Sequence, residues 1–96
     1  MDVSTAISAM SALAQPTRMR VVAALKDRFP SGMSVGDLAK AVETPPNTMS
    51  SHLAILSRAG LVVAQRLGRV IEYRTDPTTI RDLAEFILSQ GPTKPQ

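Results

Sequence analysis

The segment most informative about the fold runs from Pro45 to Val62 and reads PPNTMSSHLAILSRAGLV. Pro46 fits the first position of a helix, and it drives Pro45 into the extended geometry that a cap residue needs. Gly60 is well placed as the residue just beyond the last turn. A helix over about 46–59 is therefore predicted. At about 100° per residue, its core-facing side carries Met49, Leu53 and Leu56.

The opposite face of this helix carries small polar groups and one arginine. Its members are Asn47, Ser50, Ser51, Ala54 and Arg58. Small polar side chains let a helix come close to a major groove and bond base edges or phosphates, while Arg58 can reach the phosphate backbone. Polar small residues also occur on faces that are merely solvated, so this helix alone leaves both interpretations open.

Hydrophobic periodicity predicts helices on both sides of this stretch. Val3, Ile7, Met10 and Leu13 recur at helical spacing, and a second helix lies in QPTRMRVVAALKDRF. A short helix follows from about Val35 to Val42. Asp76-Pro77 opens the last helix, in which Ile80, Leu83, Ala84, Ile87 and Leu88 recur at helical spacing.

After Gly60 the period of the pattern changes from helical to alternating. The segment LVVAQRLGRVIEYRT predicts two short strands around a turn at Gly68, with Arg66 and Arg69 either side of the tip. The order of elements predicts a mainly α fold with a small β-hairpin, a winged helix-turn-helix. We expect one domain over residues 1–90 and a flexible tail over 91–96.

The charge of the chain is concentrated near these elements. The formal net charge is +3, and residues 45–75 carry all of it, as four arginines against one glutamate. A clustered positive field suits a polyanion such as double-stranded DNA, although it also fits a solvated basic face. No apolar run is long enough for a membrane span, and the N-terminus lacks a basic secretory region. We expect a cytoplasmic protein without a membrane partner.

Composition argues against metal and catalytic sites. The chain has no cysteine and one histidine, His52, at the edge of the apolar face of its helix. One histidine without thiols cannot complete a zinc site within one chain, and Ser50 and Ser51 lie too close to it for a catalytic triad. His52 is therefore predicted to be half-buried in packing or hydrogen bonding. No metal, cofactor or enzymatic activity is expected.

Four stretches resemble the ArsR/SmtB family of winged-helix repressors: ALAQPTRMRVVAAL (12–25), MSVGDLAKAV (33–42), NTMSSHLAILSRAGLV (47–62) and QRLGRVIEYRTDP (65–77). The resemblance implies a homodimer, built from the first and last helices, on a palindromic operator. It further implies that Thr48, Ser50, Ser51 and His52 lie at positions the family uses on DNA, with Arg66 and Arg69 on the wing.

The terminal helices independently require a partner. Each has an apolar stripe that a core of 96 residues can hardly cover, so the stripes should be exposed in a monomer. The predicted dimer interface comprises Val3, Ile7, Met10, Ile80, Leu83 and Ile87.

The chain departs from metal-sensing members of that family. Where they carry a Cys-Val-Cys-Asp-Leu segment, it has Ser34-Val35-Gly36-Asp37-Leu38, and its last helix has no histidine. Hydroxyl and carboxylate groups are poor ligands for softer metals, so zinc, cadmium and arsenite should not act as signals. The inducer and the operator sequence stay unidentified. We predict a dimeric, sequence-specific repressor. The alternative is a winged-helix protein-interaction module without specific DNA binding.

Overall fold

The helix predicted over about 46–59 is present. It spans Pro46–Arg58 (α4) in a computed structural model that describes residues 1–90. Pro45 precedes it in extended geometry, with φ −58° and ψ 144°. Gly60 has φ +77°, and the Leu61 N–H donates to the Leu56 carbonyl at 3.0 Å. Glycine adopts this left-handed conformation cheaply, so the helix ends where the sequence predicts.

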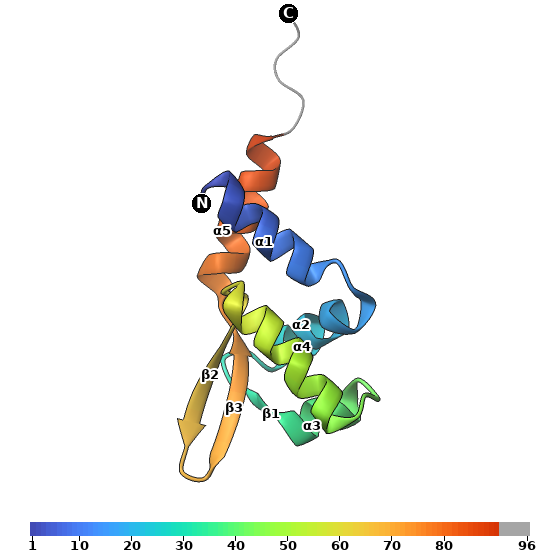
Figure 1. Cartoon of the computed structure of the whole chain (residues 1–96). Helices are drawn as coiled ribbons and strands as arrows, with labels where there is room; N and C mark the ends of the chain where they lie inside the picture. Colours follow the sequence, from blue (N-terminus) through green and yellow to red (C-terminus); the bar gives the residue numbers. More distant parts are fainter. Residues whose placement is uncertain (91–96) are drawn as a thin grey trace, which may run out of the picture.

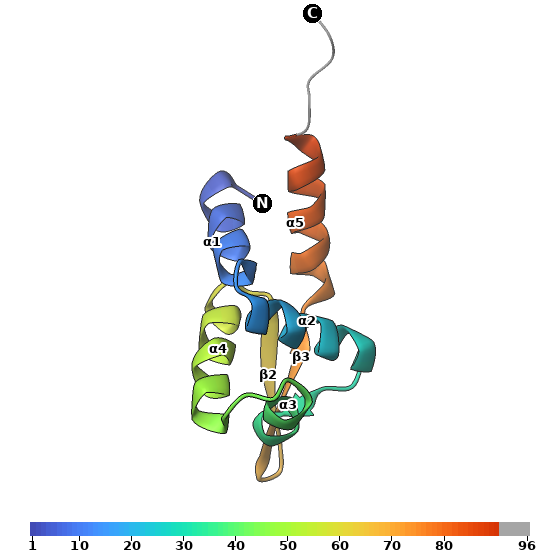
Figure 2. The ribbon, with the colours of Figure 1, turned by 90° about the vertical axis from the view of Figure 1, so that its right-hand side faces the viewer.

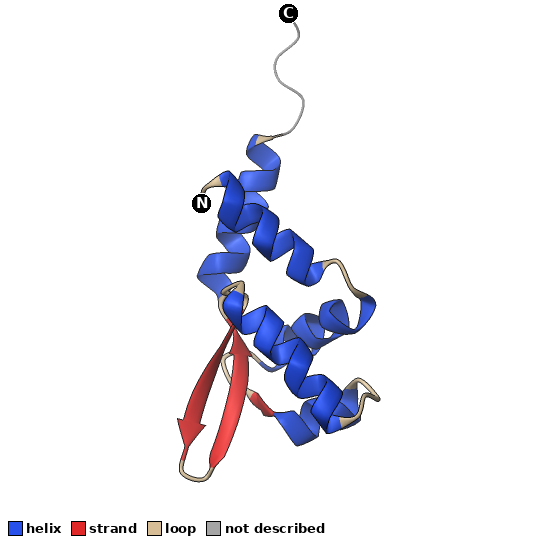
Figure 3. Ribbon diagram, in the orientation of Figure 1, coloured by secondary structure: helices blue, strands red, loops and turns tan. Residues whose placement is uncertain are grey.

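Four further helices and three strands surround α4 in the described residues (Figure 1 and Figure 3). In chain order they are α1 (Val3–Leu13), α2 (Pro16–Arg28), β1 (Met33–Ser34), α3 (Val35–Ala41), β2 (Val62–Leu67), β3 (Val70–Thr75) and α5 (Pro77–Ser89). The predicted helices and hairpin are all confirmed. The predicted flexible tail, 91–96, lies outside the described residues.

The sheet differs from the prediction by one strand. A two-stranded hairpin was expected, but β1 adds a third strand, and the strand order is β1-β3-β2 with antiparallel pairing throughout. Met33 pairs with Tyr73. A Cβ on the neighbouring Gly32 would lie 2.6 Å from the Tyr73 carbonyl oxygen, so the close approach of the two backbones requires glycine.

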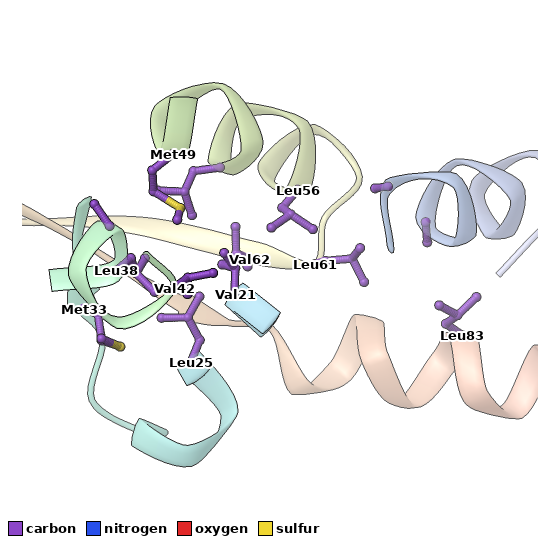
Figure 4. Packing of buried hydrophobic residues seen from close by; sticks show 14 of the residues in the cluster. Val21, Leu25, Met33, Leu38, Val42, Met49, Leu56, Leu61, Val62 and Leu83 are labelled. Carbon is purple, nitrogen blue, oxygen red and sulfur yellow. The ribbon is translucent and has the colours of Figure 1, made fainter. Parts of the chain in front are cut away.

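The buried core lies between the helices and the base of the hairpin (Figure 4). Met49, Leu53 and Leu56 are fully buried, as the helical spacing of α4 predicts. From α2 and α3 come Val21, Leu25 and Leu38, and from the start of the hairpin come Leu61 and Val62. This core fixes α4 with its apolar side inward, and the opposite side is therefore presented to solvent.

The two ends of the molecule carry different elements (Figure 1 and Figure 2). The hairpin projects beyond α3 and α4 at one end, while α1 and the C-terminal part of α5 lie at the other. The separation leaves the hairpin tip and the N-terminal part of the outer face of α4 clear of the terminal helices, whereas Arg58, at the other end of that face, lies near α1.

Candidate nucleic-acid interface

The outer face of α4 is fully presented to solvent. All of the residues expected on this face are exposed, namely Asn47, Ser50, Ser51, Ala54 and Arg58, and Thr48 beside them is exposed too. Asn47 and Arg58 lie at opposite ends of this face, about 16 Å apart along the helix axis at 1.5 Å per residue. A helix with a fully buried apolar side and a row of short polar side chains can approach another surface closely.

Local hydrogen bonds organise the first turns of α4. Pro45 supplies no side-chain cap. Instead, Oδ1 of Asn47 accepts from the Thr48 N–H at 2.9 Å, and the Ser51 hydroxyl donates to the Asn47 carbonyl at 3.4 Å. This contact is long, and the exposed Ser51 hydroxyl can both donate to and accept from base edges, phosphates or bridging water.

The hairpin carries its two arginines in the predicted places. Leu67 pairs with Val70, so Gly68 and Arg69 form the two-residue turn, and Arg66 lies opposite Ile71 on the paired strand. Gly68 has φ +64°, as the first central residue of a type II′ turn requires. Both arginines are exposed and can neutralise phosphates.

His52 makes a contact that the sequence does not reveal. Its ring is partly buried, and Nδ1 lies 3.2 Å from a terminal nitrogen of Arg18 on α2. Burial, followed by the nearby positive charge of Arg18, lowers the pKa of His52 below its ordinary value of 6.5. Because arginine can only donate, Nδ1 accepts and the proton of the neutral ring is on Nε2. The expected half-buried, hydrogen-bonding histidine is confirmed.

Arg18 is the residue at this site that sequence reasoning missed. Its Nε donates to the Ala12 carbonyl at 2.6 Å, so one side chain joins the end of α1 to α4. The two ends of the Arg18–His52 contact are 34 residues apart in the chain. No local pattern marks such a pair.

The exposed apolar surface of α1 agrees with the prediction, whereas on α5 the prediction holds for Ile87 but not for Ile80 and Leu83. Val3, Ile7 and Met10 are exposed, with 60% of Val3 accessible, because α1 turns Ala6, Ala9 and Ala12 into the core. Leu83 was expected to be exposed in one chain, yet only 5% of it is accessible. Leu83 belongs to the chain's own core, and Ile80 packs against it. Both residues therefore lie on the face of α5 that meets the same chain.

The free apolar surface of α5 therefore lies one turn further along. Ile87 is 48% accessible and Leu88 is 79% accessible. Ile87 was predicted as an interface residue, whereas Leu88 was not. Apolar residues at helical spacing predict an amphipathic helix. The spacing does not tell which of these residues pack on the same chain and which stay exposed.

The described residues contain no group of three or more His, Cys, Asp or Glu side chains placed to hold a metal ion. Ser34, at one position where metal sensors carry a thiol, accepts from the Asp37 N–H at 3.1 Å and caps α3. Its hydroxyl therefore stabilises the N-terminus of α3. Within residues 1–90, every helix is too short or too polar to cross a bilayer.

Comparison with known proteins agrees with this geometry. The sequence profile of a helix-turn-helix domain family matches residues 13–65. The regulator KmtR of Mycobacterium tuberculosis is 42% identical over 71 residues, which cover 74% of this chain and 52% of KmtR. The chain thus spans about half the length of that relative. The transcriptional repressor SdpR of Bacillus subtilis is 30% identical over 78 residues, covering 81% of this chain and 83% of SdpR.

A solved structure extends the likeness to the fold. The homodimeric winged helix-turn-helix DNA-binding domain of a possible ArsR-family regulator from Mycobacterium bovis superposes with a TM-score of 0.76. It is 25% identical, and the match covers 91% of this chain and 79% of that one. Together with the exposed polar face of α4 and the arginine-bearing hairpin, these matches show that the chain belongs to the ArsR/SmtB family of winged helix-turn-helix, DNA-binding transcriptional regulators.

Proposed function

We propose that the chain acts as a homodimeric repressor that binds a palindromic operator and blocks access to a promoter in the cytoplasm. The observation that carries this proposal is α4, whose apolar side is fully buried and whose polar side is fully exposed beside an arginine-bearing hairpin. Two copies of α4, about 34 Å apart, would enter successive major grooves on one side of the duplex.

Each element has a distinct part in this mechanism. The short side chains of α4 contact base edges, chiefly through Asn47, Thr48, Ser50 and Ser51. His52, held by Arg18, sets the position of the helix and presents Nε2–H toward a phosphate or base. Arg58, Arg66 and Arg69 neutralise phosphates, and the wing arginines can also enter an adjacent minor groove. Stoichiometry of two chains per operator follows from the symmetry.

Three observations support repression by a dimer. SdpR is named a transcriptional repressor, and the M. bovis domain is homodimeric. The exposed apolar residues of α1 and α5, described above, offer the surface for a second copy. With no cysteine and Ser34 engaged as a helix cap, release by thiol chemistry or by thiophilic metals is not part of the proposal.

The test begins with selection of bound fragments from genomic DNA. A labelled operator and a scrambled duplex of the same composition are then titrated at physiological salt, and anisotropy is followed. We expect two chains per operator, at least a thousandfold preference over the scrambled duplex, and loss of transcription from the adjoining promoter in a purified system. Equal affinity for both duplexes would instead support the protein-interaction alternative, and increased transcription would identify an activator.

A matched pair of serine variants makes the test specific to α4. Ser51→Ala removes a hydroxyl from the exposed face of α4, whereas Ser31→Ala removes one from the exposed loop after α2. Both changes are small and lie at the surface. Reduced operator preference in the first variant only would support the proposal, and equal behaviour of the two would count against this face of α4.

A further inference from the structure

A cavity of about 420 Å³ lies at the junction of α2, the end of β3 and the start of α5. Its volume is within the range of about 300–1,000 Å³ that small-molecule sites occupy. The apolar part of its lining includes Phe29, Ile80 and Ala84, and Thr75 adds a buried hydroxyl-bearing residue. The cavity is separate from the outer face of α4 and from the hairpin tip.

The charged groups at this cavity are of one sign. Lys26 from α2 and Arg81 from α5 both line it, and no lining residue is acidic. Both side chains are exposed, so each can turn toward a ligand without leaving water first. An apolar lining with two cations is complementary to a molecule that has an apolar body and one anionic group.

Phe29 provides a second indication. The chain has only two phenylalanines and one tyrosine, yet Phe29 is 43% accessible at this cavity. Large aromatic side chains bury much area when they pack. Because the side chain of Phe29 is still partly accessible, it can contact a flat apolar ligand. We propose that this cavity binds a small apolar carboxylate, with its body against Phe29, Ile80 and Ala84 and its carboxylate between Lys26 and Arg81.

The occupant follows from the shape and the charge together. A free phosphate would leave the apolar wall unused, and a neutral apolar molecule would gain no charge-assisted contact from Lys26 or Arg81. Cavities of this kind bind through burial of the apolar body, while a bidentate guanidinium contact orients the carboxylate. The proposal stands independently of the operator-binding proposal, because its test uses no DNA.

The probe for the test is sodium cinnamate, and cinnamamide is its neutral control of nearly equal shape. Each is titrated into the full chain at concentrations where the protein is in its native oligomeric state, and amide NMR shifts are followed. We expect saturable shifts at Phe29, Ile80 and Ala84, and at least about tenfold weaker binding of cinnamamide, the change that one charge-assisted contact is worth.

Charge variants test the two cations. Lys26→Gln and Arg81→Gln should each weaken cinnamate binding about tenfold and leave cinnamamide binding unchanged. Lys40→Gln, at an exposed position on α3 outside the cavity, should change neither. All three positions are at the surface, and circular dichroism checks that the helices are kept.

A steric variant provides an independent test. Ala84 is exposed on α5 and lines the cavity, so Ala84→Phe should fill the space and abolish binding of both probes. The proposal is wrong if millimolar cinnamate causes no saturable shift. That result is expected if a partner subunit fills the cavity. It is equally wrong if the shifts spread over Val3, Ile7 and Met10 instead, or if cinnamamide binds as well as cinnamate.

Discussion

The side chain of Arg18 lies between α1 and α4, bonded at Nε to the Ala12 carbonyl at 2.6 Å and facing His52 Nδ1 at 3.2 Å. Nδ1 can accept from Arg18 only while it carries no proton. The link from the end of α1 to α4 therefore depends on the protonation state of the one histidine in the chain.

The first prediction is a pH dependence of stability that originates at His52. Its pKa is lowered in the folded protein from the ordinary 6.5, so the unfolded chain binds the proton more readily. The stabilisation is fully present above pH 6.5 and is lost as pH falls from 6.5 toward the lower folded value. Urea midpoints across this window should decline in the wild type. His52→Gln, which keeps an acceptor and cannot titrate, should show a flatter dependence.

The second prediction compares two positions with the same backbone conformation. Glu43 has φ +51° at the end of α3, and Gly60 has φ +77° at the end of α4. In both turns the next N–H reaches back to the helix: Thr44 to Ala39 at 2.9 Å, and Leu61 to Leu56 at 3.0 Å. Glu43→Gly should relieve left-handed strain and stabilise the protein by about 0.5–1 kcal/mol.

Gly60→Ala should have the opposite effect, a loss of about 1–2 kcal/mol. A Cβ at Gly60 would lie 3.6 Å from Thr79 Oγ1, an ordinary contact, so the cost comes from the backbone and not from a clash. Urea unfolding of both variants measures the two changes. If Glu43→Gly lowers the free energy of unfolding, the Glu43 side chain contributes more than its backbone strain costs.

These turns also indicate what the sequence could reveal. Pro46 and Gly60 set the ends of α4 through local backbone preferences, and those ends were predictable. Strand β1 was not, because two residues show no period and the strand exists only through pairing of Met33 with Tyr73. The third strand is thus a consequence of tertiary approach.

The terminal helices illustrate a different limit. Helical spacing identified α1 through its larger side chains, yet the structure buries Ala6, Ala9 and Ala12 and leaves Val3 and Ile7 outside. Alanine lets two backbones approach closely, and its small size gives a weak hydrophobic signal. The same ambiguity placed Leu83 on the wrong surface. Periodicity predicts that a helix is present, whereas the tertiary contacts of that helix determine which of its sides is buried.

The third prediction concerns assembly. Leu88→Glu and Ile87→Glu place a charge on the free apolar flank of α5, so they should convert a dimer to a folded monomer. Ser89→Glu adds the same charge at the neighbouring exposed position and should leave the dimer intact. Light scattering gives the mass, and circular dichroism gives the helix content.

Leu83→Glu separates the interface from the core. Because Leu83 is buried within one chain, this change should unfold the protein and not merely dissociate it. Burial of such a side chain is worth about 1.5–3 kcal/mol. A wild type that stays a folded monomer at micromolar concentration would contradict the assignment of α1 and α5 to a dimer interface.

The last prediction separates reading of the operator from anchoring on it. Arg66 and Arg69 lie at the exposed hairpin tip, and Ser51 lies on the exposed face of α4. Arg66→Ala or Arg69→Ala should weaken binding to operator and scrambled duplex alike. Each arginine that no longer neutralises a phosphate should also reduce the slope of log affinity against log salt by about 0.9. Ser51→Ala should leave the slope nearly unchanged and cost about 1–3 kcal/mol of discrimination on the operator, since a hydroxyl contributes no counterion release.

Arg28→Ala, in the last turn of α2, is the matched arginine control and should change neither quantity. Anisotropy at several salt concentrations measures both. A serine variant that weakens binding to both duplexes equally, together with wing variants that keep the wild-type slope, would reverse the roles assigned to α4 and to the hairpin.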